Sequence, residues 1–270
     1  METRFNWHSA AKLSGRIDFS FTRSLPASAW IAHLKSLSLS EAKQHMLWSQ
    51  TAAPDIPYLR LVDSAYPKAL AEQPFAPPVL YYAGRPELLQ QAALSIVGSR
   101  KSTLLGRQFA KAISSHAATI GYAVVSGLAY GIDEAAHRGA LNQTIGIMGQ
   151  GILAPRNPSR KHLCEDIIDS GGLLISEFPP DQGPQKWSYL HRNRLIAWLG
   201  NPFVLVEAAE RSGAMNTTHI ALNAQKTVYV VPHHPLVSSA QGSLSLLLEG
   251  AQPLIHPSQL PTLTQSNVLP

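Results

Sequence analysis

The chain has 270 residues, of which 45% are hydrophobic and 14% are charged, and its formal net charge is +5 at pH 7. This composition supports a substantial core and excludes disorder over most of the length. The single cysteine, Cys164, excludes an intramolecular disulfide and favours a reducing compartment. The N-terminus lacks the apolar run of a signal peptide, and no apolar run approaches the roughly 18 residues of a membrane helix. We therefore expect a cytoplasmic globular protein with no membrane segment.

The first part of the chain predicts a small helical piece and a packed lead-in. Residues 27–50 have apolar side chains at helical spacing, which predicts an N-terminal helical segment within residues 1–52. The following stretch, up to residue 84, is rich in proline and contains two strand-like runs, 59–62 and 79–82. Its large apolar residues indicate a segment packed on the main domain, because a free linker would hold fewer of them.

From residue 93, apolar β-rich runs alternate with helical segments. The runs are 93–97, 122–125, 144–148, 173–175, 203–206 and 227–231. The helix-compatible segments are 105–119, 133–141, 159–170 and 214–224. This alternation predicts an α/β fold with a doubly wound, mostly parallel sheet over residues 53–258. Residues 259–270 have the composition of a loose polar tail.

Basic residues concentrate in three windows that contain no acid. These windows lie between Glu87 and Asp133, between Glu134 and Glu165, and between Asp181 and Glu207. Glycines, hydroxyls and cations also follow the strand ends, which meet at one edge of a parallel sheet. Glycine allows a ligand to approach the backbone closely, and helix N-termini offer N–H donors to anions. The distribution favours a polyanionic partner over an ordinary mixed surface.

The common catalytic motifs are absent from the sequence. The segment GSRKSTLLG lacks the GK[ST] ending of a Walker A loop, and there is no GxGxxG or GxSxG motif. Asp133 and His137 are spaced i and i+4, which fits a metal or acid–base pair, but we favour Asp133 as a helix N-cap. The neighbouring His233 and His234 cannot complete a metal site alone. We expect no catalytic residue, no metal and no cofactor.

Six motifs in order carry a resemblance to a known family. They are IVGSRKSTLLG, VVSGLAYGID with AHRGAL, LLISEFPP, HRNRLIAWL, VEAAERSGAM and VYVVP. Together they resemble the DprA/Smf family of DNA-processing proteins over roughly residues 55–251. The resemblance implies an extended Rossmann-like fold that binds single-stranded DNA, acts without catalysis and forms a homodimer. It also implies loading of RecA recombinase and protection of DNA during natural transformation.

The family motifs and the basic strand ends together give a set of candidate DNA-binding residues. The set is Gly98, Ser99, Arg100, Lys101, Gly127, Asn157, Arg160, Lys161, Arg192, Asn193, Arg194, Ser212 and Gly213. Several departures from the family pattern stand near this set; His191 replaces the proline before the RNR motif, and Gly213, Ala214 and Met215 replace the family's GSL. Tyr130 occupies a position where the family usually has arginine, and GILAPRNP replaces the family's GLDxxYP segment.

Several roles and functions remain open from the sequence. Gly98 is expected to permit a sharp exit from the strand, Ser99 to donate its hydroxyl, and Arg100 to grip phosphate bidentately. Arg192 and Arg194 either contact phosphate or pair with Glu207 or a nearby carbonyl. Tyr130 is either a stacking face or a core residue. The alternatives to DNA binding are a sensor of a small nucleotide and an enzyme similar to nucleoside-monophosphate phosphoribohydrolases, whose PGGxGT loop is absent here.

Overall fold

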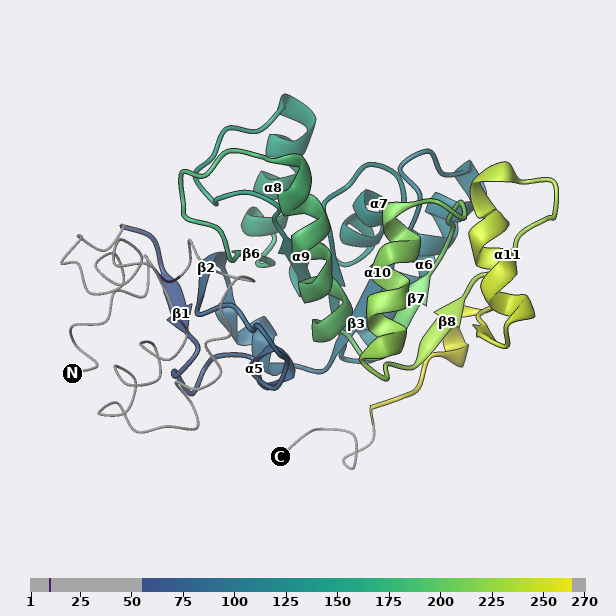
Figure 1. The fold of residues 1–270 in the computed structure, drawn as a ribbon, viewed down its shortest axis with the longest axis horizontal. Coiled ribbons are helices and arrows are strands. Elements are labelled where there is room, and N and C mark those ends of the chain that lie inside the picture. The colour runs from purple at the N-terminus through teal and green to yellow at the C-terminus, as the bar shows by residue number, and fades with distance from the viewer. Residues whose placement is uncertain (1–9, 11–54, 264–270) are drawn as a thin grey trace, which may run out of the picture.

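The strands of the computed structural model form one nine-stranded sheet (Figure 1). The structure describes Ala10 and residues 55–263, so the expected helical segment lies almost entirely outside the described residues. The order across the sheet is β1-β2-β6-β5-β4-β3-β7-β8-β9. The strands are β1 (Tyr58–Arg60), β2 (Val79–Gly84), β3 (Ala93–Val97), β4 (Ala123–Ser126), β5 (Thr144–Ile147), β6 (Leu173–Ser176), β7 (Phe203–Leu205), β8 (Val228–Val230) and β9 (Gln252–Pro253).

The predicted sheet is confirmed, with boundaries shifted by one or two residues. All neighbours from β6 to β9 pair in parallel, while β1 and β2 add an antiparallel edge through the β2–β6 pair. The residues of β4, β5, β6 and β7 are buried throughout. Their sequences therefore read as continuous apolar runs, as expected for strands covered on both faces. The lead-in packs on the main sheet, also as predicted.

Helices cover both faces of the sheet, which confirms the doubly wound architecture. In Figure 1, α6 and α7 lie behind the sheet, while α9 and α10 lie in front of it. The helices are α5 (Lys68–Ala71), α6 (Leu104–Thr119), α7 (Ile132–Gly139), α8 (Pro158–Asp169), α9 (Lys186–Leu199), α10 (Gly213–Asn223) and α11 (Gln241–Leu248). Buried side chains form two apolar clusters, and the cluster of Ala110, Ile113 and Ile132 belongs to the α6–α7 face.

Three of the described helices, α5, α9 and α11, were not among the predicted segments. In α9 every residue from Arg192 to Leu199 is buried, and these residues surround the helix on all sides. A helix that is enclosed in this way has no polar face and therefore no clear 3.6-residue period in its sequence. The consequence is important for the site, because the expected RNR motif lies inside this helix and not in a loop.

The chain changes direction across the sheet after β6. It passes from β3 through β4 and β5 to β6, and then returns to β7 on the other side of β3. The connections that leave β3 and β7 therefore diverge at their carboxyl ends, which opens a crevice at that edge of the sheet. This topology explains why motifs that are far apart in the sequence meet at one place.

The start of the expected polar tail is packed, so that expectation is wrong up to residue 263. Leu260 is 3% exposed, and the Tyr122 hydroxyl donates to the Pro261 carbonyl at 3.0 Å. Leu263 packs against the α6–α7 cluster. Residues 264–270 lie outside the described part. Among the described residues, no helix is both long and apolar enough to cross a membrane.

Candidate nucleic-acid interface

The crevice divides into two cavities that share Arg100, Ala129 and Arg192. The first, which we term the hydroxyl groove, has a volume of about 650 Å³ and lies over the carboxyl end of β3 and the N-terminus of α10. The second, which we term the arginine pocket, has a volume of about 330 Å³ and lies over β4, β5 and the start of α8. The groove is lined by residues that include Gly98, Ser99, Lys101, Asn193, Ser212, Gly213, Thr217, Ser238 and Ser239. The pocket is lined by residues that include Gly127, Leu128, Tyr130, Met148, Gln150, Arg156, Asn157, Arg160, Cys164 and Tyr189.

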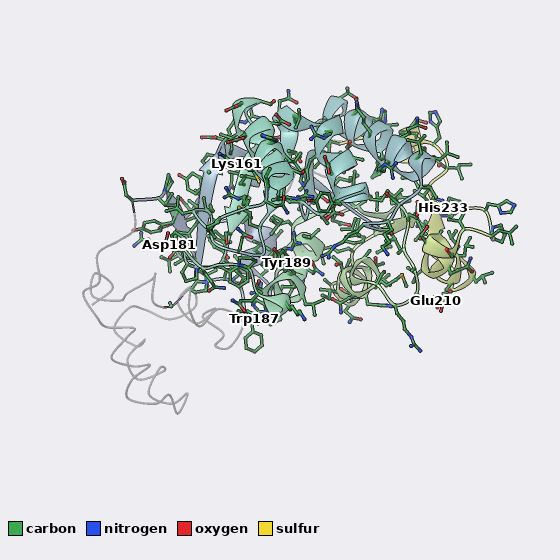
Figure 2. All side chains as sticks on the ribbon, turned by 90° about the horizontal axis from the view of Figure 1, so that it is seen from above. Lys161, Asp181, Trp187, Tyr189, Glu210 and His233 are labelled. Atoms are coloured by element: carbon green, nitrogen blue, oxygen red, sulfur yellow. The ribbon has the colours of Figure 1, made fainter. Side chains whose placement is uncertain are left out.

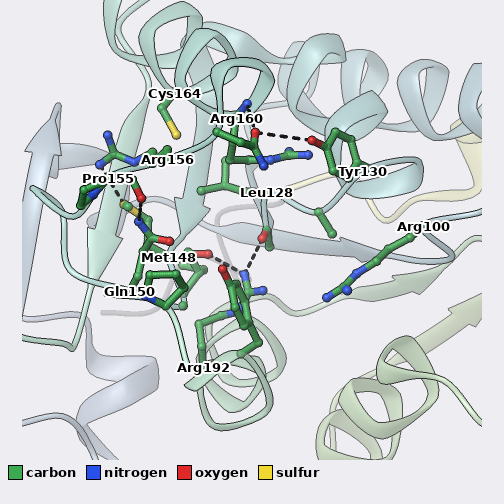
Figure 3. A pocket seen from close by; sticks show the side chains of 17 residues that line it. Arg100, Leu128, Tyr130, Met148, Gln150, Pro155, Arg156, Arg160, Cys164 and Arg192 are labelled. Carbon is green, nitrogen blue, oxygen red and sulfur yellow. Dashed lines mark hydrogen bonds between the residues drawn. The ribbon is translucent and has the colours of Figure 1, made fainter. Parts of the chain in front are cut away.

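The turn after β3 presents two cations to solvent. Arg100 and Lys101 are exposed, and the Lys101 amide donates to the Ser99 hydroxyl at 3.1 Å. The Arg100 side chain extends into the crevice toward Arg192 (Figure 3). Gly98 is required by close packing: a Cβ there would lie 2.6 Å from Cγ1 of Ile132. The turn is thus held by its backbone, while its charged side chains remain available.

A buried carboxylate occupies the N-terminus of α6. Glu207, at the end of β7, accepts from the Thr103 amide at 3.0 Å and from the Thr103 hydroxyl at 2.8 Å. It also accepts from the Ser239 hydroxyl at 2.6 Å. Thr103 is the N-cap of α6, so the positive end of this helix is already neutralised by the protein. Phosphate at this edge would therefore be bound by side chains of the β3 turn and by the N-terminus of α10, not by α6.

Arg192 is part of the scaffold between the two cavities. Its Nη1 donates to the carbonyls of Gly127 at 2.6 Å and Ile147 at 2.5 Å, and the residue is 3% exposed. Burial lowers the pKa of Arg192 to about 10, although nearby Asp133 acts in the opposite direction. A Cβ on Gly127 would lie 2.5 Å from Nη1 of Arg192 and 2.7 Å from Oδ2 of Asp133, so a larger residue there would displace these two side chains. The sequence left open whether Arg192 contacts phosphate or pairs within the protein. The structure shows that it pairs with backbone carbonyls.

Arg194 forms a buried ion pair away from both cavities. Its Nη2 lies 2.5 Å from Oε2 of Glu177, and Glu177 is completely buried. His191 approaches the same carboxylate oxygen at 3.4 Å. The partner of Arg194 is therefore Glu177 and not Glu207. Because its guanidinium points into the core, Arg194 leaves the set of proposed DNA contacts, and its geometry supports a structural role.

The start of α8 forms one wall of the arginine pocket. Asn157 caps this helix by accepting from the Arg160 amide at 3.0 Å. The Tyr130 hydroxyl donates to the same Asn157 oxygen at 3.4 Å, and the Arg160 guanidinium lies 4.2 Å from the centre of the Tyr130 ring. Tyr130 is 46% exposed, so it is not a core residue. Lys161 lines neither cavity; its ammonium group lies 3.7 Å from Glu165.

Asp133 and His137 serve the loop that follows β4. Asp133 accepts from the amides of Gly127 at 3.2 Å and Ala129 at 3.4 Å, so the expectation that it caps α7 is wrong; Gly131 occupies that position. His137 accepts from the Leu128 amide at 3.3 Å, which leaves its Nδ1 to donate to Thr144. Burial raises the pKa of Asp133, and burial lowers the pKa of His137 to about 3. Within the described residues, no group of three or more His, Cys, Asp or Glu side chains could hold a metal ion.

The structure brings all the candidate residues except Lys161 and Arg194 to the two cavities. Sequence reasoning missed Tyr189, Gln150 and Arg156, which also line the arginine pocket. Tyr189 lies in α9, the helix that the apolar period did not reveal. Trp187, two residues earlier, is 50% exposed and projects outward from the molecule (Figure 2), away from the lining of either cavity.

The fold and the site together define an extended Rossmann-like α/β protein with a cationic crevice at its topological switch point. The family model described as DNA recombination-mediator protein A matches residues 58–264. The chain therefore belongs to the DNA recombination-mediator protein A family, which confirms the resemblance to DprA and Smf proteins.

Individual relatives agree with this assignment. Protein Smf of Synechocystis is 36% identical over 205 residues, a match that covers 73% of this chain and 51% of that protein. The chain thus spans about half the length of this relative. The crystal structure of DNA processing protein A from Streptococcus pneumoniae shares the fold, with a TM-score of 0.77 at 24% identity over 95% of this chain and 97% of the other. A Helicobacter pylori DNA processing protein A, described in a study of its single-stranded DNA binding mode, has a TM-score of 0.68 at 30% identity and covers 76% of this chain and 94% of its own.

Proposed function

We propose that the chain binds single-stranded DNA in the crevice and acts as a recombination mediator that loads RecA. The observation that carries this proposal is the cationic crevice at the carboxyl edge of the sheet, in a chain of the DNA recombination-mediator family. The single-stranded DNA binding described for the Helicobacter pylori relative supports the same ligand.

The chemistry of the hydroxyl groove suits a phosphodiester backbone. Arg100 offers a planar fork of donors that matches phosphate oxygens, and Lys101 adds a flexible point charge. Ser99, Ser212 and Ser238 line the same groove with hydroxyl groups. Ser212 also caps α10 by accepting from the Met215 amide at 3.2 Å, and the N-terminus of this 11-residue helix lies at the groove. These donors read the backbone and not the bases, so we expect little sequence preference.

The direct test is competitive binding of labelled oligo-dT. Unlabelled oligo-dT should displace the label at far lower concentrations than duplex DNA or a mononucleotide, because several phosphates are held at once. Equal displacement by duplex or by mononucleotide would contradict the proposal. Arg85 provides a matched control outside the crevice: it is exposed, and its Nη2 donates to the Asn142 carbonyl at 2.7 Å.

RecA loading and assembly as a homodimer form the finer part of the proposal. We expect the protein to accelerate RecA filament formation on strands coated with a single-strand-binding protein, as measured by RecA ATPase activity. We expect analytical ultracentrifugation to show a dimer. DNA binding without RecA stimulation would reduce the function to strand protection.

We further propose that the crevice has no catalytic role. Glu207 is the carboxylate that we would consider for a catalytic acid in this crevice. It accepts hydrogen bonds from Thr103 and Ser239 and so links the two loops that contain them. Incubation with nucleoside monophosphates should release no free base. Base release that disappears in Glu207→Gln would favour an enzyme similar to the phosphoribohydrolases.

A further inference from the structure

The arginine pocket has an unbalanced positive charge. Among the described residues that line it, four are arginines, namely Arg100, Arg156, Arg160 and Arg192, and none is aspartate or glutamate. The hydroxyl groove, in contrast, includes Asp133. An arginine cluster without an acid is costly unless an anionic ligand is present for part of the time.

Several guanidinium nitrogens in the pocket have no intramolecular partner. Among the described residues, Nη1 of Arg160, Nε of Arg156 and Nε of Arg192 are buried and make no hydrogen bond. Each of these nitrogens has less than 1 Å² of accessible surface, so an acceptor in the pocket reaches them only if the side chains move; the positive charge of the guanidinium groups is what faces the cavity. Arg100 faces Arg192 across the mouth of the pocket, and Arg160 lies on the opposite wall beside Tyr130 (Figure 3).

The floor of the pocket is apolar and closed. Leu128, Met148 and Cys164 line it and are 6%, 3% and 3% exposed. Burial raises the pKa of the Cys164 thiol, which leaves this wall uncharged. At about 330 Å³, the pocket has about half the volume of the groove. A strand that enters it meets core side chains, so the pocket suits the end of a strand and not its middle.

We propose that the arginine pocket binds a nucleotide that carries a terminal phosphomonoester. The source of this nucleotide is either the phosphorylated end of a single strand or a free nucleoside monophosphate. The base packs on the apolar floor, while the phosphate accepts from Arg100 and Arg160, and the buried Arg192 adds positive charge beside them. A phosphomonoester carries close to two negative charges at neutral pH and a phosphodiester carries one, so this arginine cluster favours the former. For a strand end, the inference rests on the proposed single-stranded DNA binding.

The test compares short oligo-dT carrying a 5′-phosphate, a 3′-phosphate or hydroxyl groups at both ends, together with dTMP and thymidine. We expect one phosphorylated end to raise affinity about tenfold over the hydroxyl form, the effect of one charge-assisted contact. Arg160→Met should abolish that preference, so that phosphorylated and hydroxyl forms bind with equal affinity. Arg160→Lys should retain part of it, because the charge remains while the planar contact with Tyr130 is lost.

Lys161→Met is the matched control for this test. It removes a cation from the next residue of α8, but Lys161 is exposed and lines neither cavity, so the phosphate preference should persist. Equal binding of phosphorylated and hydroxyl ends by the unmodified protein overturns the inference and leaves DNA binding intact. A preference that survives in Arg160→Met also overturns it. Arg160-dependent binding of dTMP without binding of any oligonucleotide supports the pocket and refutes the proposed function.

Discussion

The turn after β3 and the middle of α9 contain the same kind of residue in opposite environments. Arg100 is exposed at the rim of the crevice. Arg192 and Arg194 are 3% and 8% exposed and donate to carbonyls or to Glu177. All three follow a predicted strand and belong to motifs that resemble the same family. The difference shows that an arginine in a motif can be exposed at the rim of the crevice or engaged in the scaffold that shapes it.

The largest effect is expected when Arg194 is replaced with alanine. We expect a loss of about 3–5 kcal/mol in the free energy of unfolding, because the buried carboxylate of Glu177 would lose its guanidinium partner. Chemical denaturation measures this loss. The control is Arg138→Ala, whose exposed ion pairs with Glu134 and Asp166 should contribute less than about 1 kcal/mol.

A second variant separates charge from packing at this site. Replacing Arg194 with methionine and Glu177 with leucine together should restore much of the stability, since no buried charge remains. If Arg194→Ala unfolds no more easily than the Arg138 control, the ion pair is not structural and Arg194 returns to the set of DNA contacts.

The next effect concerns Arg100, where the loss should fall on binding and not on folding. Arg100→Ala should weaken single-stranded DNA binding by about 1.5–3 kcal/mol, or roughly tenfold to a hundredfold, through loss of a charge-assisted contact. Arg100→Lys should recover only part of it, because the bidentate geometry is lost. Fluorescence anisotropy and thermal unfolding, measured on the same samples, separate the two effects.

Arg85→Ala is the control for this variant, since Arg85 lies outside both cavities. If Arg100→Ala binds single-stranded DNA normally, the DNA-binding site lies outside the groove. One that unfolds would show that the exposed turn is as structural as α9.

Acid should weaken the buried scaffold. Burial, aided by Arg160 and Arg192, lowers the pKa of His137 from 6.5 to about 3. The folded state therefore resists protonation, so the stability present above pH 6.5 is lost as the pH falls toward 3. This group contributes a slope of at most about 1.4 kcal/mol per pH unit. Urea denaturation across this range should show a flatter slope for His137→Gln; identical slopes would exclude His137 as the cause.

The smallest effect should appear in the salt dependence of binding. The logarithm of affinity should fall linearly with the logarithm of salt concentration, with a slope of about −0.7 for each phosphate neutralised. Arg100→Ala should reduce the slope by about one such contact, whereas Lys161→Met should leave it unchanged. An affinity independent of salt would contradict phosphate binding by the crevice.

The sequence by itself determined the parallel sheet and the edge at which the site lies. The apolar runs fixed the strands because β4 to β7 are buried on both faces, and a parallel sheet places all their carboxyl ends together. That reasoning alone brought Ser99, Arg100 and Arg160 to one edge. It also identified the family, because the motifs there occur in a specific order.

Only the tertiary structure decided which of these side chains are free to bind a ligand. The second half of α9, from Arg192 to Leu199, is enclosed by the core, so this part carries no helical period, and the burial of Arg192 and Arg194 could not be predicted from it. The carbonyl and carboxylate partners of these arginines lie 17 to 65 residues away in the chain. Such contacts depend on which helix packs over which strand. They are set by the order of strands in the sheet, which local sequence patterns do not encode.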